Sequence, residues 1–468
     1  MTSHSTAVIA GVGAATESLG VIDLMTLAAR RAVEDTGASA LGAHLDVVVT
    51  PAGTWRSGDP GRIAAARCGS PGATSILAQL GVSQQGILNE GIRLIRDGEA
   101  GVVLIVGGEA RRHERDEPET PVPGDPDLVL ERPSDFVDPV EIDAGIAFPA
   151  VRSYALIERA YQHRHGRDQR AQRAQRGELW SSMSRVALEN PDAAFPHERS
   201  ATWLETTSDE NPVLSTPYHR FHASQWTVDQ AAALILVSPQ AVEHFDVDPT
   251  RVVAPHVALE SSLAIPLIRR PRLGEWPAMG LLGRAAEAHL GRPLDSIALR
   301  ELYSCFPVAV SIQAEELGLP LTPAPSITGG MTFAGGPFNN FVFQSLAALV
   351  GRLRDDPGSM GLVTTVSGLL TKPGLSIWST EPPDHGVLLD DLHAQAATLD
   401  EPLEVTTRPS GSIRIESSTT FRDAEGDRAV VIGRDERGKR TLVTISDRAA
   451  IAHFSEHSGI GEELAASW

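Results

Sequence analysis

The 468-residue chain is 42% hydrophobic and 21% charged, which is enough apolar material for two or three domains with sizeable cores. Lys and Arg number 40 against 60 Asp and Glu, and the formal net charge of -20 argues against nucleic acid as the main partner. The two cysteines, Cys68 and Cys305, favour neither a disulfide framework nor a metal cluster, so we expect no metal site. The N-terminus shows no signal-peptide pattern and no apolar run is as long as a membrane span, so we expect a cytoplasmic protein.

Strands and helices alternate along the first part of the chain. Short apolar runs are followed by segments with helical periodicity, and this alternation favours a parallel α/β core. The predicted elements are a strand at 7–15, a helix at 21–37, a strand at 45–53, a helix at 81–100 and an apolar strand at 101–110.

A long irregular stretch interrupts this pattern between residues 111 and 225. It is polar, rich in Pro, Arg and His, and far too long for a plain connection, so we expect an inserted loop domain. Regular structure resumes with TVDQAAALILVS, which is the predicted last strand of an N-terminal half spanning 1–248.

The stretch 249–388 repeats the order of elements of the first half. In both halves a glycine-flanked turn opens the helix that precedes an apolar strand, which indicates an internal duplication. In the second half this turn lies in SITGGMTFAGGPFNN, residues 326–340. A glycine-rich turn at a helix start presents free N–H groups and the positive end of the helix dipole, and both suit an anion or an oxyanion.

The tail, residues 390–468, has a different pattern. Its runs IRIES and AVVIG alternate with period two and are separated by turns such as DAEGD and DERGK. This pattern predicts a small C-terminal β domain that is barrel-like, or OB-like, in form.

Several of these segments, in this order, resemble the thiolase superfamily. IRDGEAGVVLIVGGEA and VDQAAALILVS resemble segments of a thiolase's first half, ELYSCFPVAVSIQAEELGL resembles the segment with the NEAF or HDCF motif, and GGMTFAGGP resembles the GG-x4-GHP motif. The β tail is similar to that of the divergent thiolase-like proteins of type one. The resemblance implies a duplicated α/β thiolase fold: two βαβαβαββ halves in a five-layer αβαβα arrangement, with an inserted loop domain.

The same resemblance shows where this sequence departs from the family at its catalytic side chains. Counting back from Gly98, the position of the acylated cysteine falls at Gly81, and that of the GHP histidine falls at Gly336. The family's second cysteine falls near Val366, and the asparagine or histidine of the NEAF or HDCF motif falls at Tyr303. The glycine turns are therefore expected to keep the backbone of an active site without its usual nucleophile and base.

The catalytic candidates lie on a strand end and in the second glycine turn. Tyr303 is a candidate acid or base and Cys305 a candidate nucleophile, the alternatives being a packed tyrosine and an inert buried cysteine. Asn339, with Asn340, either caps the following helix or donates to a substrate carbonyl. The full set of catalytic candidates is Tyr303, Ser304, Cys305, Gly336 and Asn339.

The substrate-binding candidates are more scattered. Ser83 is also a good helix N-cap, His219 and His222 either face one site or pack in the loop domain, and Lys372 is either a substrate contact or a solvated side chain. The basic stretch 163–176 either meets coenzyme A phosphates or forms an exposed helix face. The full set is Gly81, Val82, Ser83, His219, Gly335, Ser367 and Lys372.

The resemblance implies an acyl-CoA or another acyl thioester as substrate, with no bound cofactor. The first hypothesis is an acyltransferase of lipid metabolism, or an enzyme of C–C bond chemistry, that works without the cysteine nucleophile. An aldolase-like lyase using Tyr303 and a non-catalytic protein that binds a thioester or a partner remain open. The protein is expected to be a monomer or a homodimer.

Overall fold

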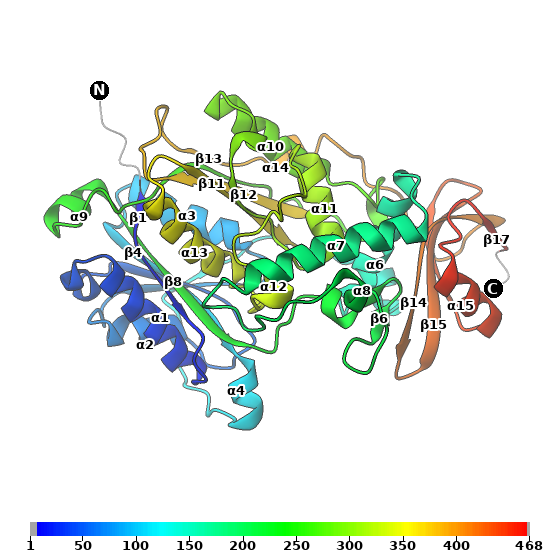
Figure 1. Ribbon diagram of the computed structural model, residues 1–468, viewed down its shortest axis with the longest axis horizontal. Coiled ribbons are helices and arrows are strands. Elements are labelled where there is room, and N and C mark those ends of the chain that lie inside the picture. Colours follow the sequence, from blue (N-terminus) through cyan, green and yellow to red (C-terminus); the bar gives the residue numbers. More distant parts are fainter. Residues whose placement is uncertain (1–6, 466–468) are drawn as a thin grey trace.

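The structure is a computed structural model that describes residues 7–465. Its α/β core has two sheets with helices on both faces of each (Figure 1). The first sheet has the order β1-β8-β4-β2-β3-β5, with β8 antiparallel to both of its neighbours and the remaining pairs parallel. Its strands are β1 (Val8–Ala15), β8 (Asp229–Val237), β4 (Val102–Ala110), β2 (Val47–Pro51), β3 (Thr74–Ala78) and β5 (Leu128–Leu130).

The second sheet repeats the order of the first. The order β2-β4-β8-β1 in the first sheet corresponds to the order β10-β11-β12-β9 in the second, and in both the first pair is parallel and the next two pairs are antiparallel. This agreement confirms the internal duplication. The strands, in the order β10-β11-β12-β9-β13, are β10 (Leu299–Glu301), β11 (Met360–Ser367), β12 (Lys372–Ser379), β9 (Ala254–Glu260) and β13 (Leu388–Asp391).

The first half has a strand, β3, just before its central helix, and the second half has no strand at the equivalent place, residues 317–329. There the chain reads PLTPAP, and Pro320, Pro323 and Pro325 have no N–H to donate to a strand ladder. The strand β10 is also short, because its pairing with β11 ends at Glu301 and the irregular residues 302–306 lead into the next helix.

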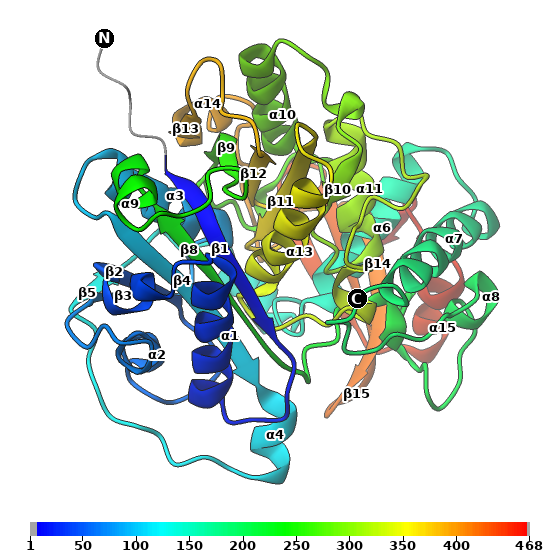
Figure 2. The same ribbon diagram turned by 60° about the vertical axis from the view of Figure 1, so that its left-hand side comes forward.

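The helices complete five layers, as the resemblance to the thiolase superfamily implied. The helices α3 (Gln84–Arg96) and α13 (Phe341–Asp355) share one apolar core with both sheets and form the middle layer (Figure 2). The outer face of the first sheet packs on α1 (Val21–Asp35) and α2 (Pro60–Arg67). The outer face of the second packs on α10 (Pro277–Leu290) and α11 (Pro307–Glu316).

The stretch expected to be a loop domain contains two long helices, α6 (Val151–Arg164) and α7 (Gln169–Ala187), in the same apolar cluster as α11. Its smaller elements are α4 (Arg111–Asp116), α5 (Pro139–Asp143), α8 (Ala201–Leu204), β6 (Val213–Ser215) and β7 (Tyr218–His219). Short helices elsewhere are α9 (Pro239–His244), α12 (Gly330–Phe333) and α14 (His393–Ala396). Along residues 7–465, no helix combines the length and apolar character needed to cross a bilayer.

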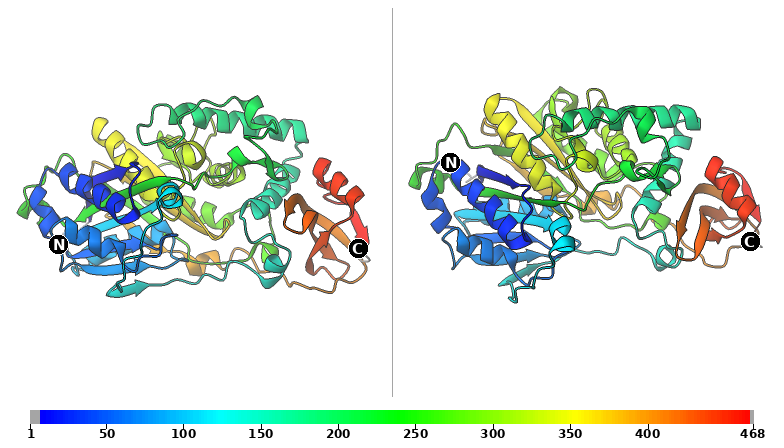
Figure 3. Two further views of the ribbon diagram at one scale, coloured as in Figure 1. Left: turned by 90° about the horizontal axis from the view of Figure 1, so that it is seen from below. Right: turned by 60° about the horizontal axis from the view of Figure 1, so that its bottom comes forward.

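The C-terminal domain is a curled antiparallel half-barrel at one end of the molecule (Figure 3). Its sheet has the order β16-β15-β14-β17, and α15 (Arg448–Glu456) closes a small core of its own. The other face packs on the loop domain, where Ser417 Oγ donates to the carbonyl of Leu156 at 2.6 Å. The strands are β14 (Ser412–Asp423), β15 (Gly426–Asp435), β16 (Arg440–Ile445) and β17 (Glu463–Ala465).

Candidate functional site

The two central helices begin next to each other. Ser83 Oγ caps α3 by accepting the N–H of Gly86 at 2.8 Å. The side chain of Gln84, the first residue of α3, accepts the N–H of Val342 in the first turn of α13 at 2.7 Å. Asn340 is the N-cap residue of α13 but forms no capping bond, so the predicted asparagine cap is wrong and Gln84 takes its place. Two positive dipole ends therefore point toward the same region.

A buried lysine side chain donates a hydrogen bond to the turn before α3. Lys372 is only 1% exposed, and its Nζ donates to the carbonyls of Gly81 at 2.5 Å and Pro133 at 3.2 Å. Burial lowers the pKa of this ammonium group. A Cβ at Gly81 would lie 3.1 Å from both the Arg132 carbonyl oxygen and Ser134 Cβ, so the position expected for the nucleophile is closely covered.

Glu260, at the end of β9, is a charged residue of this region that the sequence analysis missed. Its carboxylate accepts hydrogen bonds from Ser83 Oγ at 2.9 Å and Asn89 Nδ2 at 3.2 Å. Burial raises its pKa, and its charge raises that of Lys372 in turn. In the sequence, the only sign of this role was the position of Glu260 as an acidic residue at the end of an apolar strand. Val82 is buried beside Ser83, and Ser367 pairs with Lys372 at the β11–β12 turn.

The second glycine turn is tightly packed. Gly335 has φ 104°, and a Cβ there would lie 2.2 Å from Gln230 Oε1. At Gly336 a Cβ would lie 3.1 Å from Ser224 Cβ, and the Gly336 N–H donates to the carbonyl of Gln225 at 2.9 Å. The expectation that this N–H is free to hold an oxyanion is therefore wrong.

The strand end 303–305 has three side chains with different surroundings. Burial and the neighbouring Cys305 raise the pKa of Tyr303, although a hydrogen bond with Gln84 lowers it in part, so the phenol stays neutral. Ser304 is buried, and its Oγ accepts the N–H of Met331 at the start of α12. Burial raises the pKa of the Cys305 thiol to about 12, against a smaller lowering by Tyr154. These groups are therefore weak nucleophiles, but Tyr303 is available as a hydrogen-bond donor.

Asn340 is the polar side chain of this region that most needs an explanation. It is fully buried at 0% exposure, and neither Nδ2 nor Oδ1 has a partner among the described residues. It comes so close to β4 that a Cβ at Gly107 would lie 2.5 Å from its Oδ1. Its neighbour Asn339 donates from Nδ2 to the carbonyl of Ala52 at 3.1 Å. Buried amides without partners are rare and frequently mark ligand or water sites.

Other unpartnered buried atoms belong to the same helices and strands as this site. They are Gln85 Oε1 on α3, Gln344 Oε1 on α13, Thr365 Oγ1 on β11 and Ser376 Oγ on β12. The structure thus brings the start of α3, the start of α13, Tyr303 and Lys372 to one region between the two halves. We call this the interhelix site. Its rim exposes two apolar side chains, Leu80 at 54% and Phe338 at 38%.

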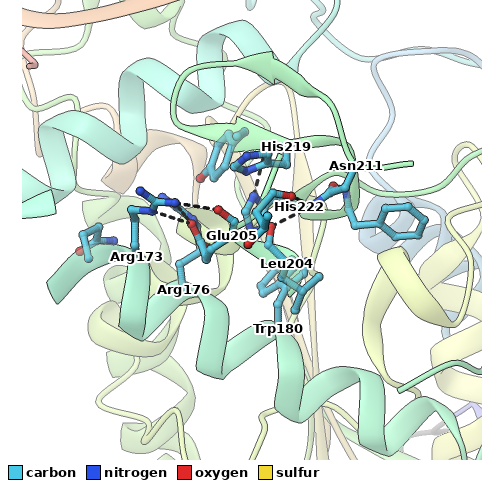
Figure 4. A network of polar contacts seen from close by, with 12 residues as sticks. Arg173, Arg176, Trp180, Leu204, Glu205, Asn211, His219 and His222 are labelled. Atoms are coloured by element: carbon cyan, nitrogen blue, oxygen red, sulfur yellow. Dashed lines mark hydrogen bonds and ion pairs between the residues drawn. The ribbon is translucent and has the colours of Figure 1, made fainter. Parts of the chain in front are cut away.

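His219 lies elsewhere, in a buried network of the loop domain (Figure 4). Its ring Nε2 lies 3.1 Å from Thr207 Oγ1. Its main-chain N–H donates to Nδ1 of His222 at 3.1 Å. Glu205 receives a bidentate pair from Arg176, at 2.8 and 2.5 Å, and lies 3.1 Å from Nε2 of His222. Burial lowers the pKa of His219 to about 4, with a further lowering from His222.

The trio Glu205, His219 and His222 has the residue types of a metal site, with ligand atoms within 4.8 Å of one another. The arrangement does not fit one, because both carboxylate oxygens of Glu205 already accept from the buried guanidinium of Arg176. A dication would have to displace that guanidinium or lie against it. The network is better explained as a polar core that fixes β7 and α8 against α7.

Comparison with solved structures defines the class of the protein. The chain matches the dimeric peroxisomal thiolase of Saccharomyces cerevisiae (TM-score 0.57, 13% identity, covering 81% of this chain and 99% of that one). It also matches an acetyl-CoA acetyltransferase from Syntrophomonas wolfei (TM-score 0.58, 14% identity, covering 81% and 99%). These likenesses establish the thiolase fold. No protein-family profile and no curated protein sequence matched the chain.

A solved structure that matches nearly the whole chain narrows the class of thiolase-fold protein. A monomeric SCP2-thiolase like protein type 1 from Mycobacterium smegmatis matches with a TM-score of 0.85 and 28% identity, over 98% of this chain and 96% of that one. The protein is thus a thiolase-superfamily protein similar to the SCP2-thiolase like proteins of type 1, the branch that the sequence pointed to. An Ltp2-ChsH2(DUF35) aldolase also shares the fold (TM-score 0.58, 19% identity, covering 80% and 98%).

Proposed function

We propose that the protein binds an acyl thioester, with acyl-CoA as the substrate class, at the interhelix site. The observation that carries the proposal is Asn340, a fully buried amide without a partner at the start of α13. A thioester carbonyl would accept from its Nδ2, and the dipoles of α3 and α13 would favour negative charge developing on that oxygen. The exposed Leu80 and Phe338 offer apolar surface to the approaching ligand.

The chemistry that fits these groups is acyl transfer by direct attack, or C–C bond chemistry, without an acyl-enzyme intermediate. Burial keeps the Cys305 thiol protonated, and Ser83 is engaged as a helix cap and as a donor to Glu260. Tyr303, held neutral, would donate a proton or a hydrogen bond to the reacting oxygen. Gly81, Val82, Gly335, Gly336, Asn339, Ser367 and Lys372 would shape the site around the substrate.

An aldolase-like lyase is the second candidate. The neutral phenol of Tyr303 beside Gln84 supports it, because a general acid can protonate the oxygen of a reacting carbonyl. The fold is shared with an aldolase, although that likeness concerns the fold alone. A protein that binds the thioester without reaction is the third. We further propose a cytoplasmic monomer, in line with the monomeric M. smegmatis relative.

Titration calorimetry with acetyl-CoA and a non-hydrolysable acyl-CoA analogue tests the binding proposal. Asn340→Ala should weaken binding about ten-fold or more, while thermal stability is kept because no hydrogen bond is lost. Asn211→Ala is the matched control. Asn211 is equally buried but fully bonded, to Leu204 O at 3.0 Å and Phe221 N at 3.0 Å, so its removal should cost stability and leave binding unchanged. Equal binding by wild type and Asn340→Ala would reject the site.

A further inference from the structure

A cavity of about 580 Å³ lies at the seam between the loop domain and the C-terminal half-barrel. One wall comes from α6, α7 and the β6–β7 hairpin, and the other from β14 and α15. Neither the loop domain nor the half-barrel forms the cavity alone. Its volume is in the range of small-molecule sites, and it is separate from the interhelix site because none of its lining residues comes from α3, α13 or the turns before them.

The wall contains a buried arginine that has no counter-ion among residues 7–465. Arg159, on α6, is 3% exposed, and its guanidinium donates only to the main-chain carbonyls of Phe454 at 2.9 Å and Ser455 at 3.4 Å. Its Nε is buried without any partner, and no carboxylate within the described chain pairs with it. Burial and the nearby Arg176 lower its pKa to about 10, which still leaves the group charged at neutral pH. A buried charge without a partner is costly unless a ligand compensates it.

The other arginines of the cavity are already neutralised. Arg176 pairs with Glu158 at 3.1 Å and with Glu205 at 2.5 Å. Arg173 lies 3.4 Å from the same Glu205, and Arg422 pairs with Asp427 at 2.7 Å. Four guanidinium groups thus face three carboxylates, which leaves one positive charge, that of Arg159. In a protein with a formal net charge of -20, a cavity with a positive excess suits a monoanion.

The rest of the lining defines the ligand further. Val213 and Leu214 are among the exposed large apolar side chains of the protein, and both face this cavity with Pro217 and Ile451. The hydroxyls of Thr216 and Thr420 bond to each other at 2.8 Å. The lining also has Gln162, Gln169 and Gln172, whose Nε2 groups already donate within the protein, so few donors are free for a polar ligand body. We propose that this seam cavity binds an organic monocarboxylate with an apolar chain, its carboxylate on Arg159 and its chain on the β6–β7 side. The site would join the half-barrel to the loop domain, and it is independent of the proposed function.

Calorimetric titration of the full chain with octanoate tests the proposal. Saturable binding is expected, weakened about ten-fold or more by Arg159→Met and less than about three-fold by Arg422→Met, because Arg422 is exposed and already paired. Octanol should bind at least about ten-fold more weakly than octanoate. No saturable binding, or equal binding by Arg159→Met, would overturn the proposal. Tighter binding of octyl phosphate would overturn the carboxylate assignment.

Two further variants keep the test decisive. If circular dichroism shows that Arg159→Met does not fold, Leu214→Trp replaces it, since this change fills the apolar end and leaves Arg159 intact. Loss of octanoate binding then supports the proposal, and unchanged binding overturns it. Gly336→Leu, which alters the interhelix site, should leave octanoate binding unchanged. A parallel loss in that variant would place octanoate in the other site and overturn the seam assignment.

Discussion

Gln84 and Val342 are 258 residues apart, and the side chain of Gln84 accepts the main-chain N–H of Val342 at 2.7 Å. The bond joins the first turns of the two central helices, one from each half of the duplicated core. Helix starts have N–H groups without intrahelical partners, and here one helix supplies the acceptor for the other. The relative position of the two dipole ends, on which the proposed site depends, is therefore fixed by a side chain rather than by apolar packing alone.

Gln84→Leu should lower the free energy of unfolding by about 1–3 kcal/mol, because it leaves the buried Val342 N–H without an acceptor. Urea denaturation followed by circular dichroism measures the change. Gln395→Leu on the exposed face of α14 is the control and should change stability by less than about 0.5 kcal/mol. A Gln84→Leu protein as stable as the control would show that this bond does not hold the helices.

The sequence predicted the fold because its signals are local and repeated. Apolar strands and amphipathic helices recur in the same order in both halves, and glycines stand where the chain turns with positive φ, as at Gly81 and Gly335. The edge strands β5 and β13 were not predicted, since each has only three or four residues, with half-exposed or exposed side chains. Such strands form because a neighbouring strand offers free hydrogen-bonding groups.

The candidate site was harder to predict because its contacts join distant parts of the chain. The turns at Gly81 and Gly336 were found, but the roles of Gln84, Glu260 and Asn340 depend on partners more than 150 residues away, or on the lack of any partner. No periodicity carries that information. The environment of Lys372 was equally hidden, because a lysine in a turn sequence is ordinarily solvated.

Incubation with acetyl-CoA should produce no covalent acetyl-enzyme. The Cys305 thiol, with its pKa raised to about 12 by burial, is almost entirely protonated at neutral pH, and Ser83 Oγ is bonded to Glu260 and to the N–H of Gly86. Intact-protein mass spectrometry should find the unmodified mass, and thiolysis of acetoacetyl-CoA should be absent or very slow. A stable acetyl adduct on either residue would contradict this mechanism.

Gly336→Leu should abolish acyl-thioester binding, whereas Cys305→Ala should leave it largely intact. A Cβ at Gly336 already lies 3.1 Å from Ser224 Cβ and 3.3 Å from Met331 Cε, so a leucine must displace the turn before α13. Gly351→Leu, within α13 and with nothing within 4 Å of its added Cβ, controls for the substitution itself. Titration calorimetry reports all three. If Gly336→Leu binds as tightly as Gly351→Leu, the ligand binds elsewhere.

Stability should fall as the pH decreases from about 6.5 to about 4. The pKa of His219 is lowered to about 4 in the fold, so over this range the unfolded chain takes up a proton that the folded chain does not. The loss should reach up to about 3 kcal/mol, and above pH 6.5 this residue contributes no pH dependence. Urea denaturation at several pH values should show a shallower decline for His219→Gln. An unchanged decline would mean that His219 is not the group responsible.

Limited digestion with proteinase K should cut the C-terminal third first at residues 397–402. These residues are exposed or half-exposed, and the N–H groups of Asp400 and Glu401 donate to no other described residue. Protection begins at Leu403, whose N–H donates to Arg269 O at 2.8 Å, and continues through the strands of the half-barrel. Early cuts throughout 412–445 would contradict a folded domain.

The nicked domain should stay attached to the rest of the protein. Its sheet packs on α6, with Val430 and Ile432 in the large apolar cluster of the second half, and its β14 accepts the Thr216 N–H from the loop domain at Thr420 O, 2.8 Å away. Size-exclusion chromatography of the digest should therefore give one peak containing both fragments, and denaturing gels should resolve them. Separation of the fragments under native conditions would show that the seam contacts are too weak to hold the half-barrel, and with it the wall of the seam cavity.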